Sequence, residues 1–123
     1  MKYLIPFVVA LLIVGCSKEE ANTTLNADDF NAKIQSGVTL LDVRTPEEYS
    51  TGHIESSMNV DFKNPSFEEN ILMFDKSKTY AVYCASGVRS GKAAELMREK
   101  GFTSVYTLEG GIKTWNEKGL PLE

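Results

Sequence analysis

The sequence is poor in the residue types that metal sites and nucleic-acid-binding surfaces require. Its 123 residues include one histidine, His53, and two cysteines, Cys16 and Cys84, so no histidine and cysteine cluster with zinc-ligand spacing exists. Acidic residues outnumber basic ones by 17 to 13, whereas a protein that follows a nucleic-acid backbone needs a basic face. We therefore expect no metal, no other cofactor and no nucleic-acid partner.

The length and composition of the chain are typical of one folded domain. A chain of 123 residues falls within the usual size of a single domain and is too short for a two-domain enzyme. Hydrophobic residues make up 42% and charged residues 24%, which is unlike a disordered or collagen-like chain. We expect one hydrophobic core and a monomer.

A long uncharged stretch near the first residue is typical of a signal peptide. Residues 3–14 read YLIPFVVALLIV, with Lys2 before them and no further charge until Lys18. A membrane-spanning helix needs about 20 residues, whereas the apolar region of a signal peptide needs about 7–15. Residues 13–16, Ile-Val-Gly-Cys, resemble the lipobox of bacterial lipoproteins, in which the chain is cut before the cysteine and the cysteine is lipidated.

These signals predict an exported protein with a lipid anchor in a bacterial envelope membrane. We expect residues 1–15 to be the removed signal peptide, Cys16 to carry the lipid, and residues 16–25 to form a polar tether. The domain, residues 26–123, would then lie in the periplasm or on the cell surface. A buried strand or a failed membrane helix is the alternative for the apolar stretch. Lipidation of Cys16 leaves Cys84 without a disulfide partner, so its thiol is either buried and inert or retained for its reactivity.

The remainder of the chain alternates between strand and helix patterns. Short apolar runs rich in β-branched residues predict strands at 38–43, 58–60, 79–83 and 104–108. Capping residues and helical spacing of apolar positions predict helices at 26–34, from Thr45 to Gly52, from Ser66, at 90–100 and at 112–118. Thr45 and Ser66 each match the capping-box pattern. This alternation predicts an α/β fold with a parallel sheet covered on both faces.

Residues 84–90, Cys-Ala-Ser-Gly-Val-Arg-Ser, join the strongest predicted strand to the strongest predicted helix. Ligand sites in parallel sheets lie beyond the carboxyl ends of the strands. Cys84 is at such a position, because it directly follows the strand predicted at 79–83. Small residues and Gly87 let successive N–H groups turn toward one point, and the start of the helix adds its positive dipole end. Both effects stabilise a thiolate. The sequence therefore predicts Cys84 as a nucleophile, and a substrate-binding loop of Ala85, Ser86, Gly87, Val88 and Arg89.

Several other residues have predicted roles at or near this loop. The guanidinium of Arg89 presents a planar fork of donors suited to the oxygens of a sulfur or phosphorus oxyanion. Asp42 and Arg44 end another buried strand and are expected to form a supporting salt bridge, with Ser90 as a further supporting residue. His53 is expected in a structural turn rather than as a general base. The alternative for Cys84 is a small hydrophobic residue packed at a strand end.

Seven segments occur in an order and spacing that resemble the rhodanese (sulfurtransferase) domain from about residue 26 to residue 122. They are LDVR at 41–44, EY at 48–49, GHI at 52–54, NV at 59–60, YCASGVRS at 83–90, GF at 101–102 and LEGGI at 108–112, followed by Trp115. The resemblance implies a five-stranded parallel sheet with helices on both faces. It also implies that a persulfide on Cys84 carries sulfane sulfur from a donor such as thiosulfate to a thiol or cyanide acceptor. Ser57 and Met58 depart from the family, which often has Gly-Ala there.

The length of the loop favours sulfur chemistry over phosphate chemistry. The spacing from Cys84 to Arg89 is C-x4-R, whereas tyrosine and dual-specificity phosphatases and their rhodanese-like relatives use C-x5-R. The shorter loop suits one sulfur atom on the cysteine better than a phosphoryl group, which disfavours a phosphatase or arsenate reductase. Ala85, Ser86 and Val88 lack the charges of thiosulfate-specialised members, so the loop does not support a preference for thiosulfate. A non-catalytic or redox-sensing binding module remains the alternative function.

Overall fold

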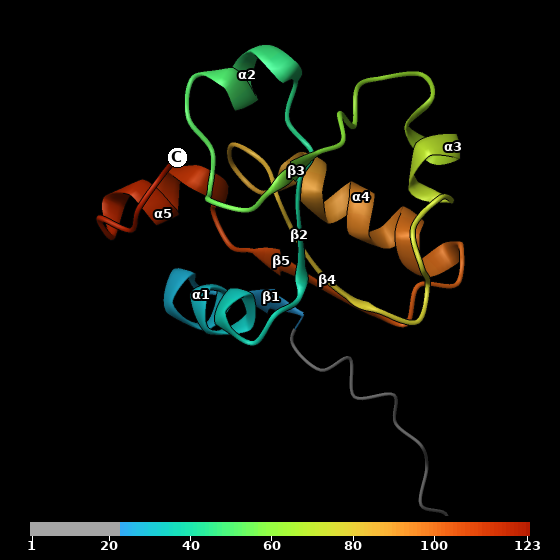
Figure 1. Ribbon diagram of the computed structural model, residues 1–123, viewed down its shortest axis with the longest axis horizontal. Helices are drawn as coiled ribbons and strands as arrows, with labels where there is room; N and C mark the ends of the chain where they lie inside the picture. The colour runs from blue at the N-terminus through green and yellow to red at the C-terminus, as the bar shows by residue number, and fades with distance from the viewer. Residues whose placement is uncertain (1–22) are drawn as a thin grey trace, which may run out of the picture.

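The computed structural model describes residues 23–123 as one five-stranded parallel sheet with helices on both faces (Figure 1). The strands follow the order β1-β5-β4-β2-β3, and each neighbouring pair is parallel. Their bounds are β1 (Thr24–Leu25), β2 (Thr39–Asp42), β3 (Met58–Asn59), β4 (Thr79–Tyr83) and β5 (Ser104–Leu108). The predicted α/β class and sheet are confirmed, and β4, which Cys84 follows, lies at the centre of the sheet.

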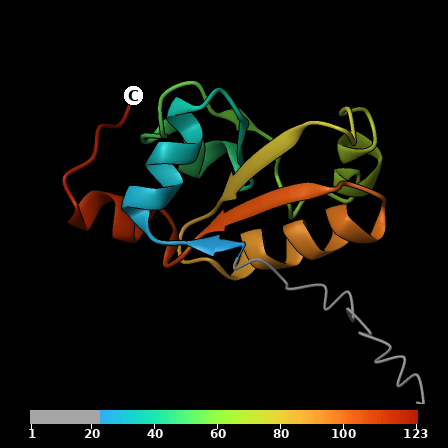
Figure 2. The same cartoon turned by 90° about the horizontal axis from the view of Figure 1, so that it is seen from below.

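Five helices connect and cover the strands. Their bounds are α1 (Ala27–Gln35), α2 (Pro46–Ser50), α3 (Phe67–Ile71), α4 (Val88–Glu99) and α5 (Gly111–Glu117). Figure 2 shows α1 and α4 on opposite sides of β4 and β5. Buried side chains of α3 and α4 share one apolar cluster, and those of α1 and α5 share the other. The sheet is therefore packed on both faces.

Alternation along β4 supplies both apolar clusters. Tyr80 and Val82 face the α3 and α4 layer, whereas Ala81 and Tyr83 face the α1 and α5 layer. All four are at most 1% exposed, because a strand covered on both faces buries successive residues alternately on each side.

Trp115 and Phe102 pack in the two apolar clusters, as expected from their apolar positions in the sequence. Trp115 of α5 and Phe102, which precedes β5, are both buried. The Phe30 ring packs edge-on against Trp115 with ring centroids 6.4 Å apart, a preferred aromatic geometry. The expected core role of Trp115 and Phe102 is confirmed.

Three local features differ from the sequence-based expectations. Thr24 and Leu25 lie in the segment assigned to the polar tether, yet they form β1 and pair with Thr107 and Leu108. A two-residue strand is too short to show a periodic pattern, and its partner lies far along the chain. Helix α4 begins at Val88 rather than Ser90, because Gly87 adopts a left-handed conformation with φ +100° immediately before it.

The Ser66 capping box is wrong. Ser66 precedes α3, but its side chain makes no capping hydrogen bond. Its φ and ψ of -89° and 9° depart from the extended conformation that an N-cap side chain normally needs. The backbone N–H of Ser66 instead donates to the Asn64 side chain at 2.8 Å, so this short helix follows an Asn turn.

The short helix α2 stands beyond the carboxyl end of β2 and buries none of its residues (Figure 1). Its capping box is present, since the Glu48 N–H donates to Thr45 Oγ1 and the Thr45 N–H donates to Glu48 Oε1, each at 3.3 Å. The hydroxyl of Tyr49 donates to the Ser57 carbonyl at 2.7 Å. Polar contacts therefore hold α2, in contrast to the apolar layers below it.

The predicted signal peptide and the predicted lipidation site Cys16 lie outside the described residues. Over residues 23–123, no helix has the length and apolar character to cross a membrane.

Candidate active site

Cys84 directly follows β4 and begins the loop that enters α4. Its side chain belongs to the apolar cluster of α3 and α4, and the residue is 1% exposed. The loop turns back over the sulfur, so that the backbone N–H of Gly87 donates to Cys84 Sγ at 3.0 Å. This turn requires the left-handed φ of +100° at Gly87, which residues with a Cβ rarely adopt. The amide cradle predicted from the sequence is thus present at Gly87.

The surroundings of the sulfur favour its ionised form. Burial raises the pKa of the Cys84 thiol, but hydrogen bonds from the Ser90 hydroxyl and from the N–H groups of Ser90, Gly87 and Ser86 outweigh burial. The pKa of Cys84 is therefore lowered from its ordinary value. Ser90 Oγ lies 3.4 Å from Cys84 Sγ and 3.2 Å from the Gly87 carbonyl oxygen. When Cys84 is a thiol, it donates to Ser90 Oγ and the hydroxyl donates to Gly87, whereas a thiolate accepts the hydroxyl proton instead. Ser90 thus contacts both the sulfur and the loop that surrounds it.

The start of α5 packs against the backbone of the nucleophile loop. The N–H of Ile112 donates to the Cys84 carbonyl at 2.9 Å. A Cβ on Gly111 would lie 2.5 Å from the carbonyl atoms of Ala85 and Cys84, so only glycine permits this approach. Gly110 and Gly111 belong to the LEGGI segment of the family resemblance, but this contact was not predicted. The adjacent glycines were the available signal, because they allow close backbone packing.

Asp42 and Arg44 form the predicted salt bridge at the end of β2. Arg44 Nη2 donates to Asp42 Oδ2 at 2.7 Å, and the two side chains are 6% and 0% exposed. Arg44 Nη2 also donates to the Gly52 carbonyl, and the Asn59 side chain donates to the carbonyls of Asp42 and Arg44. The pair therefore fixes the chain on both sides of α2, as a supporting element requires.

The hydroxyl of Tyr83, the last residue of β4, was not identified from the sequence. It accepts a hydrogen bond from the Ile54 N–H at 3.0 Å and donates to Ser57 Oγ at 3.1 Å. Burial raises the pKa of Tyr83, so the phenol stays neutral. Tyr83 thereby ties the 54–57 turn to the strand that carries Cys84.

His53 lies in a structural turn beside α2. Its ring stacks on Tyr49 with centroids 3.8 Å apart, and Nδ1 lies 3.0 Å from the Tyr49 carbonyl oxygen. The backbone of His53 exchanges two hydrogen bonds with Glu123, at 3.0 and 2.7 Å. These contacts match the expected structural role.

Arg89 is held by the carboxylate of Glu48, the third residue after the Thr45 cap and part of the EY segment. Arg89 Nη1 donates to Glu48 Oε1 at 2.7 Å, and Nη2 donates to Oε2 at 2.9 Å. The hydrogen bond from Arg89 is the main reason that the pKa of Glu48 is lowered to about 2. The fork expected to receive an oxyanion therefore faces an internal carboxylate. The two residues are 41 positions apart, so no local pattern connects them.

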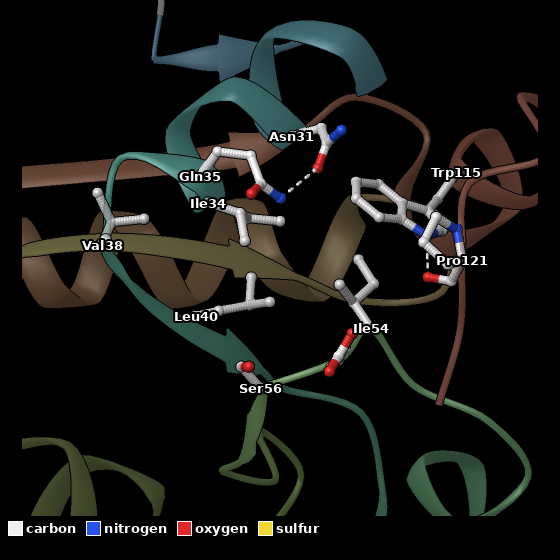
Figure 3. A pocket seen from close by; sticks show the side chains of 11 residues that line it. Asn31, Ile34, Gln35, Val38, Leu40, Ile54, Ser56, Trp115 and Pro121 are labelled. Atoms are coloured by element: carbon white, nitrogen blue, oxygen red, sulfur yellow. Dashed lines mark hydrogen bonds between the residues drawn. The ribbon is translucent and has the colours of Figure 1, made fainter.

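A hollow lies against the α1 and α5 layer (Figure 3). Ile34, Leu40, Ile54, Trp115 and Pro121 line it, with Asn31 and Gln35 at its polar side. No cysteine or histidine lines it. Within residues 23–123, no group of three histidine, cysteine or carboxylate side chains is placed to hold a metal ion. Cys84 therefore lies outside this hollow, at the loop between β4 and α4.

Comparison with known proteins agrees with this architecture. The model of the rhodanese-like domain family matches residues 26–118. The chain belongs to the rhodanese-like domain family. As expected for a rhodanese-like domain, its fold is shared with a rhodanese-related protein from Thermoplasma volcanium, at a TM-score of 0.73 and 36% identity over 81% of this chain and 96% of that one.

Two sequence relatives of this rhodanese-like domain differ in size. The uncharacterized protein YqhL of Bacillus subtilis is 32% identical over 112 residues, which cover 91% of this chain and 86% of the relative. The tRNA uridine(34) hydroxylase of Yersinia pestis is 37% identical over 110 residues, which cover 80% of this chain but 30% of the hydroxylase. The rhodanese-like domain thus spans less than a third of the hydroxylase.

Proposed function

We propose that the protein is a sulfurtransferase that carries sulfane sulfur as a persulfide on Cys84. The observation that carries this proposal is the hydrogen bond from the Gly87 N–H to Cys84 Sγ at 3.0 Å, inside a loop that lowers the pKa of the thiol. A thiolate is the nucleophilic form of cysteine, and fixed N–H groups also stabilise a negatively charged persulfide. Membership of the rhodanese-like family supports the same chemistry.

The reaction has two steps and needs no redox partner. With thiosulfate as donor, the Cys84 thiolate attacks the sulfane sulfur, a sulfur–sulfur bond to Cys84 forms, and sulfite leaves with the electron pair of the broken bond. In the second step a thiol or cyanide acceptor attacks the outer sulfur, and the Cys84 thiolate leaves. Cyanide thereby becomes thiocyanate. Covalent catalysis of this kind gives ping-pong kinetics.

The loop geometry supports a sulfur atom as the transferred group. Four residues separate Cys84 from Arg89, and the cysteine is only 1% exposed. A single sulfur extends the side chain by one atom, whereas a phosphoryl group brings three oxygens that each need donors. We therefore expect no phosphatase turnover on aryl phosphates.

A redox-sensing or docking module is the second candidate, and the lowered pKa of the Cys84 thiol is the observation that favours it, because the thiolate is the form that oxidants attack. In that case Cys84 is oxidised but transfers no sulfur. Incubation with thiosulfate followed by intact mass measurement separates the two candidates, because the sulfurtransferase gains the mass of one sulfur atom. Subsequent cyanide treatment should release thiocyanate and restore the original mass. Oxygen adducts without thiocyanate would contradict the proposed transfer.

We further propose that the protein is an exported lipoprotein anchored through Cys16. The apolar residues 3–14 and the Ile-Val-Gly-Cys sequence at 13–16 support this proposal. Expression of the full chain and its Cys16→Ala variant in a bacterial host tests it by membrane fractionation and by labelling with a fatty acid. The variant should lose both the label and detergent-sensitive membrane association. Retention of both would contradict the lipid anchor.

A further inference from the structure

The ion pair between Arg89 and Glu48 occupies the place where a donor oxyanion would be expected to bind. Both terminal nitrogens of Arg89 donate to the two oxygens of Glu48, at 2.7 and 2.9 Å, in the parallel geometry that guanidinium groups use for anions. The side chains are 19% and 33% exposed, so the pair lies at the protein surface near the loop. An incoming sulfonate group has to compete with a carboxylate that is already in place.

Glu48 is itself held firmly in position. Its Oε1 accepts hydrogen bonds from the Thr45 N–H at 3.3 Å and from Thr45 Oγ1 at 3.1 Å, in addition to the contact with Arg89. Thr45 directly follows Arg44, which is anchored by Asp42 at the end of β2. The carboxylate thus accepts hydrogen bonds from Thr45 as well as from Arg89, and the two hydrogen bonds from Arg89 are separate from the capping box.

The charge near Arg89 is also unfavourable to a doubly charged donor. The hydrogen bond to Glu48 is the main cause that raises the pKa of Arg89, and the negative charges of Glu48, Cys84 and Asp61 add to it. One guanidinium therefore faces three acidic groups. Thiosulfate would bring two more negative charges into this environment. This is unfavourable, because charges of like sign repel strongly where water is partly excluded.

Apart from Arg89, the side chains of the loop carry no charge. Val88, which lies between Gly87 and Arg89, is 62% exposed, and Ala85 is uncharged. The sulfur that is transferred needs only the N–H of Gly87, which already points at Cys84 Sγ. A donor without sulfonate oxygens therefore loses nothing when the fork of Arg89 is occupied.

We propose that Glu48 is a specificity-determining residue that disfavours oxyanion donors, and that the donor of this protein is a thiol persulfide. This inference rests on the proposed sulfurtransferase function. The Cys84 thiolate attacks the outer sulfur of the persulfide, that sulfur becomes bonded to Cys84 with its proton, and the donor leaves as a thiolate. One sulfur–sulfur bond breaks and one forms, so no oxidant or reductant is needed. Glu48 acts through Arg89 and is a positioning residue.

The test compares two donors, thiosulfate and cysteine persulfide, in single-turnover loading of Cys84 followed by intact mass. Glu48→Gln removes the charge but keeps an oxygen that accepts from Thr45. We expect its second-order rate constant for loading from thiosulfate to rise about tenfold, with that for cysteine persulfide changed by less than about twofold. Glu47→Gln is the matched control, because it removes the same charge from the same exposed turn without contact to Arg89. It should change neither value by more than about twofold.

Thr45→Ala separates charge from loosening of α2. It breaks the capping box but leaves the carboxylate, so it should lower both donor constants in parallel and leave their ratio unchanged. An unchanged ratio in Glu48→Gln, or an equal change in Glu47→Gln, would overturn the role of Glu48. Failure of Cys84 to load from either donor in every variant would instead overturn the sulfurtransferase function, and this inference with it.

A second variant, which keeps Glu48, tests the proposal even if Glu48→Gln does not fold. Arg89→Lys retains a cation for Glu48 but lacks the fork. Because Glu48 already occupies that fork, we expect the KM values for thiosulfate and for cysteine persulfide to change by the same factor, within about threefold. A rise of tenfold or more in the KM for thiosulfate alone would show that thiosulfate binds the guanidinium in spite of Glu48, and would overturn the proposal.

Discussion

Buried apolar side chains hold the layers of the sheet together, whereas polar contacts hold helix α2 in place. The layers consist of buried side chains such as Leu41, Val82 and Trp115, each at most 2% exposed. Helix α2 buries none of its residues and is held by the capping box, the Tyr49 hydroxyl and the Glu48–Arg89 pair. Stability is therefore concentrated in the layers, whereas α2 contributes charge and position at the site. Substitutions in the two regions should have separable effects.

The largest expected effect is the loss of activity in Cys84→Ser, with the layers intact. Serine is close in size, and its hydroxyl can use the partners that Cys84 Sγ has in Ser90 and Gly87, but it cannot form a persulfide. We expect no mass gain after incubation with either sulfur donor, and a thermal midpoint within about 5 °C of the native protein. Retention of sulfur transfer would contradict the role of Cys84, and Ser90→Ala provides a comparison at the same site.

The next effect is a loss of stability in Trp115→Ala, which tests the apolar layers. The indole is 2% exposed, packs edge-on against Phe30 and donates from Nε1 to the Pro121 carbonyl at 3.0 Å. Truncation of a buried aromatic residue costs about 3–5 kcal/mol. Urea unfolding measures this cost, with the exposed Lys118→Ala as control. A loss below about 1 kcal/mol would mean that this layer does not dominate stability.

The strands that form the layers were predictable because their signal is local. The runs at 79–83 and 104–108 match β4 and β5, since apolar and β-branched residues are consecutive there. Cys84 was predictable for a similar reason, because strand, glycine and helix signals are adjacent in the sequence. The separate apolar runs at 38–43 and 58–60 gave β2 and β3 with bounds one residue too wide at their ends.

Contacts between distant segments could not be predicted in the same way. Glu48 and Arg89 are separated by 41 residues, and each has a sufficient local explanation, as a capping residue and as a loop residue. The approach of Gly111 to Ala85 and the pairing of Thr24 with Thr107 likewise depend on how elements pack. The proposed donor selectivity rests on one of these contacts, so the sequence points to Cys84 more directly than to the residues proposed to select its donor.

A smaller effect is expected from Thr45→Ala, which acts on α2 alone. The substitution removes the side-chain oxygen that accepts from the Glu48 N–H at 3.3 Å, and loss of an N-cap costs about 1 kcal/mol. Urea unfolding should show this modest loss, against almost none for Ser50→Ala at the other end of the helix. A loss as large as that of Trp115→Ala would show that α2 is part of the stability core and would remove the distinction between the two regions.

The smallest effect concerns the pH dependence of α2. The hydrogen bond from Arg89 lowers the pKa of Glu48 from 4.5 to about 2 in the folded protein. The unfolded chain therefore takes up a proton at Glu48 before the folded chain does, as the pH falls. The stabilisation by this carboxylate is complete above about pH 5, and it is lost as the pH falls through 4.5 toward about 2.

Urea unfolding of the native protein and Glu48→Gln at several pH values isolates this contribution from that of other carboxylates. The difference in unfolding free energy should stay constant above about pH 5 and shrink toward pH 2. Trp115→Ala should stay parallel to the native protein over the same range, because no titrating group is changed. A Glu48→Gln difference that is independent of pH would mean that the ion pair does not stabilise α2. The pair would then act on the charge of Arg89 alone, and donor selectivity would be its only measurable consequence.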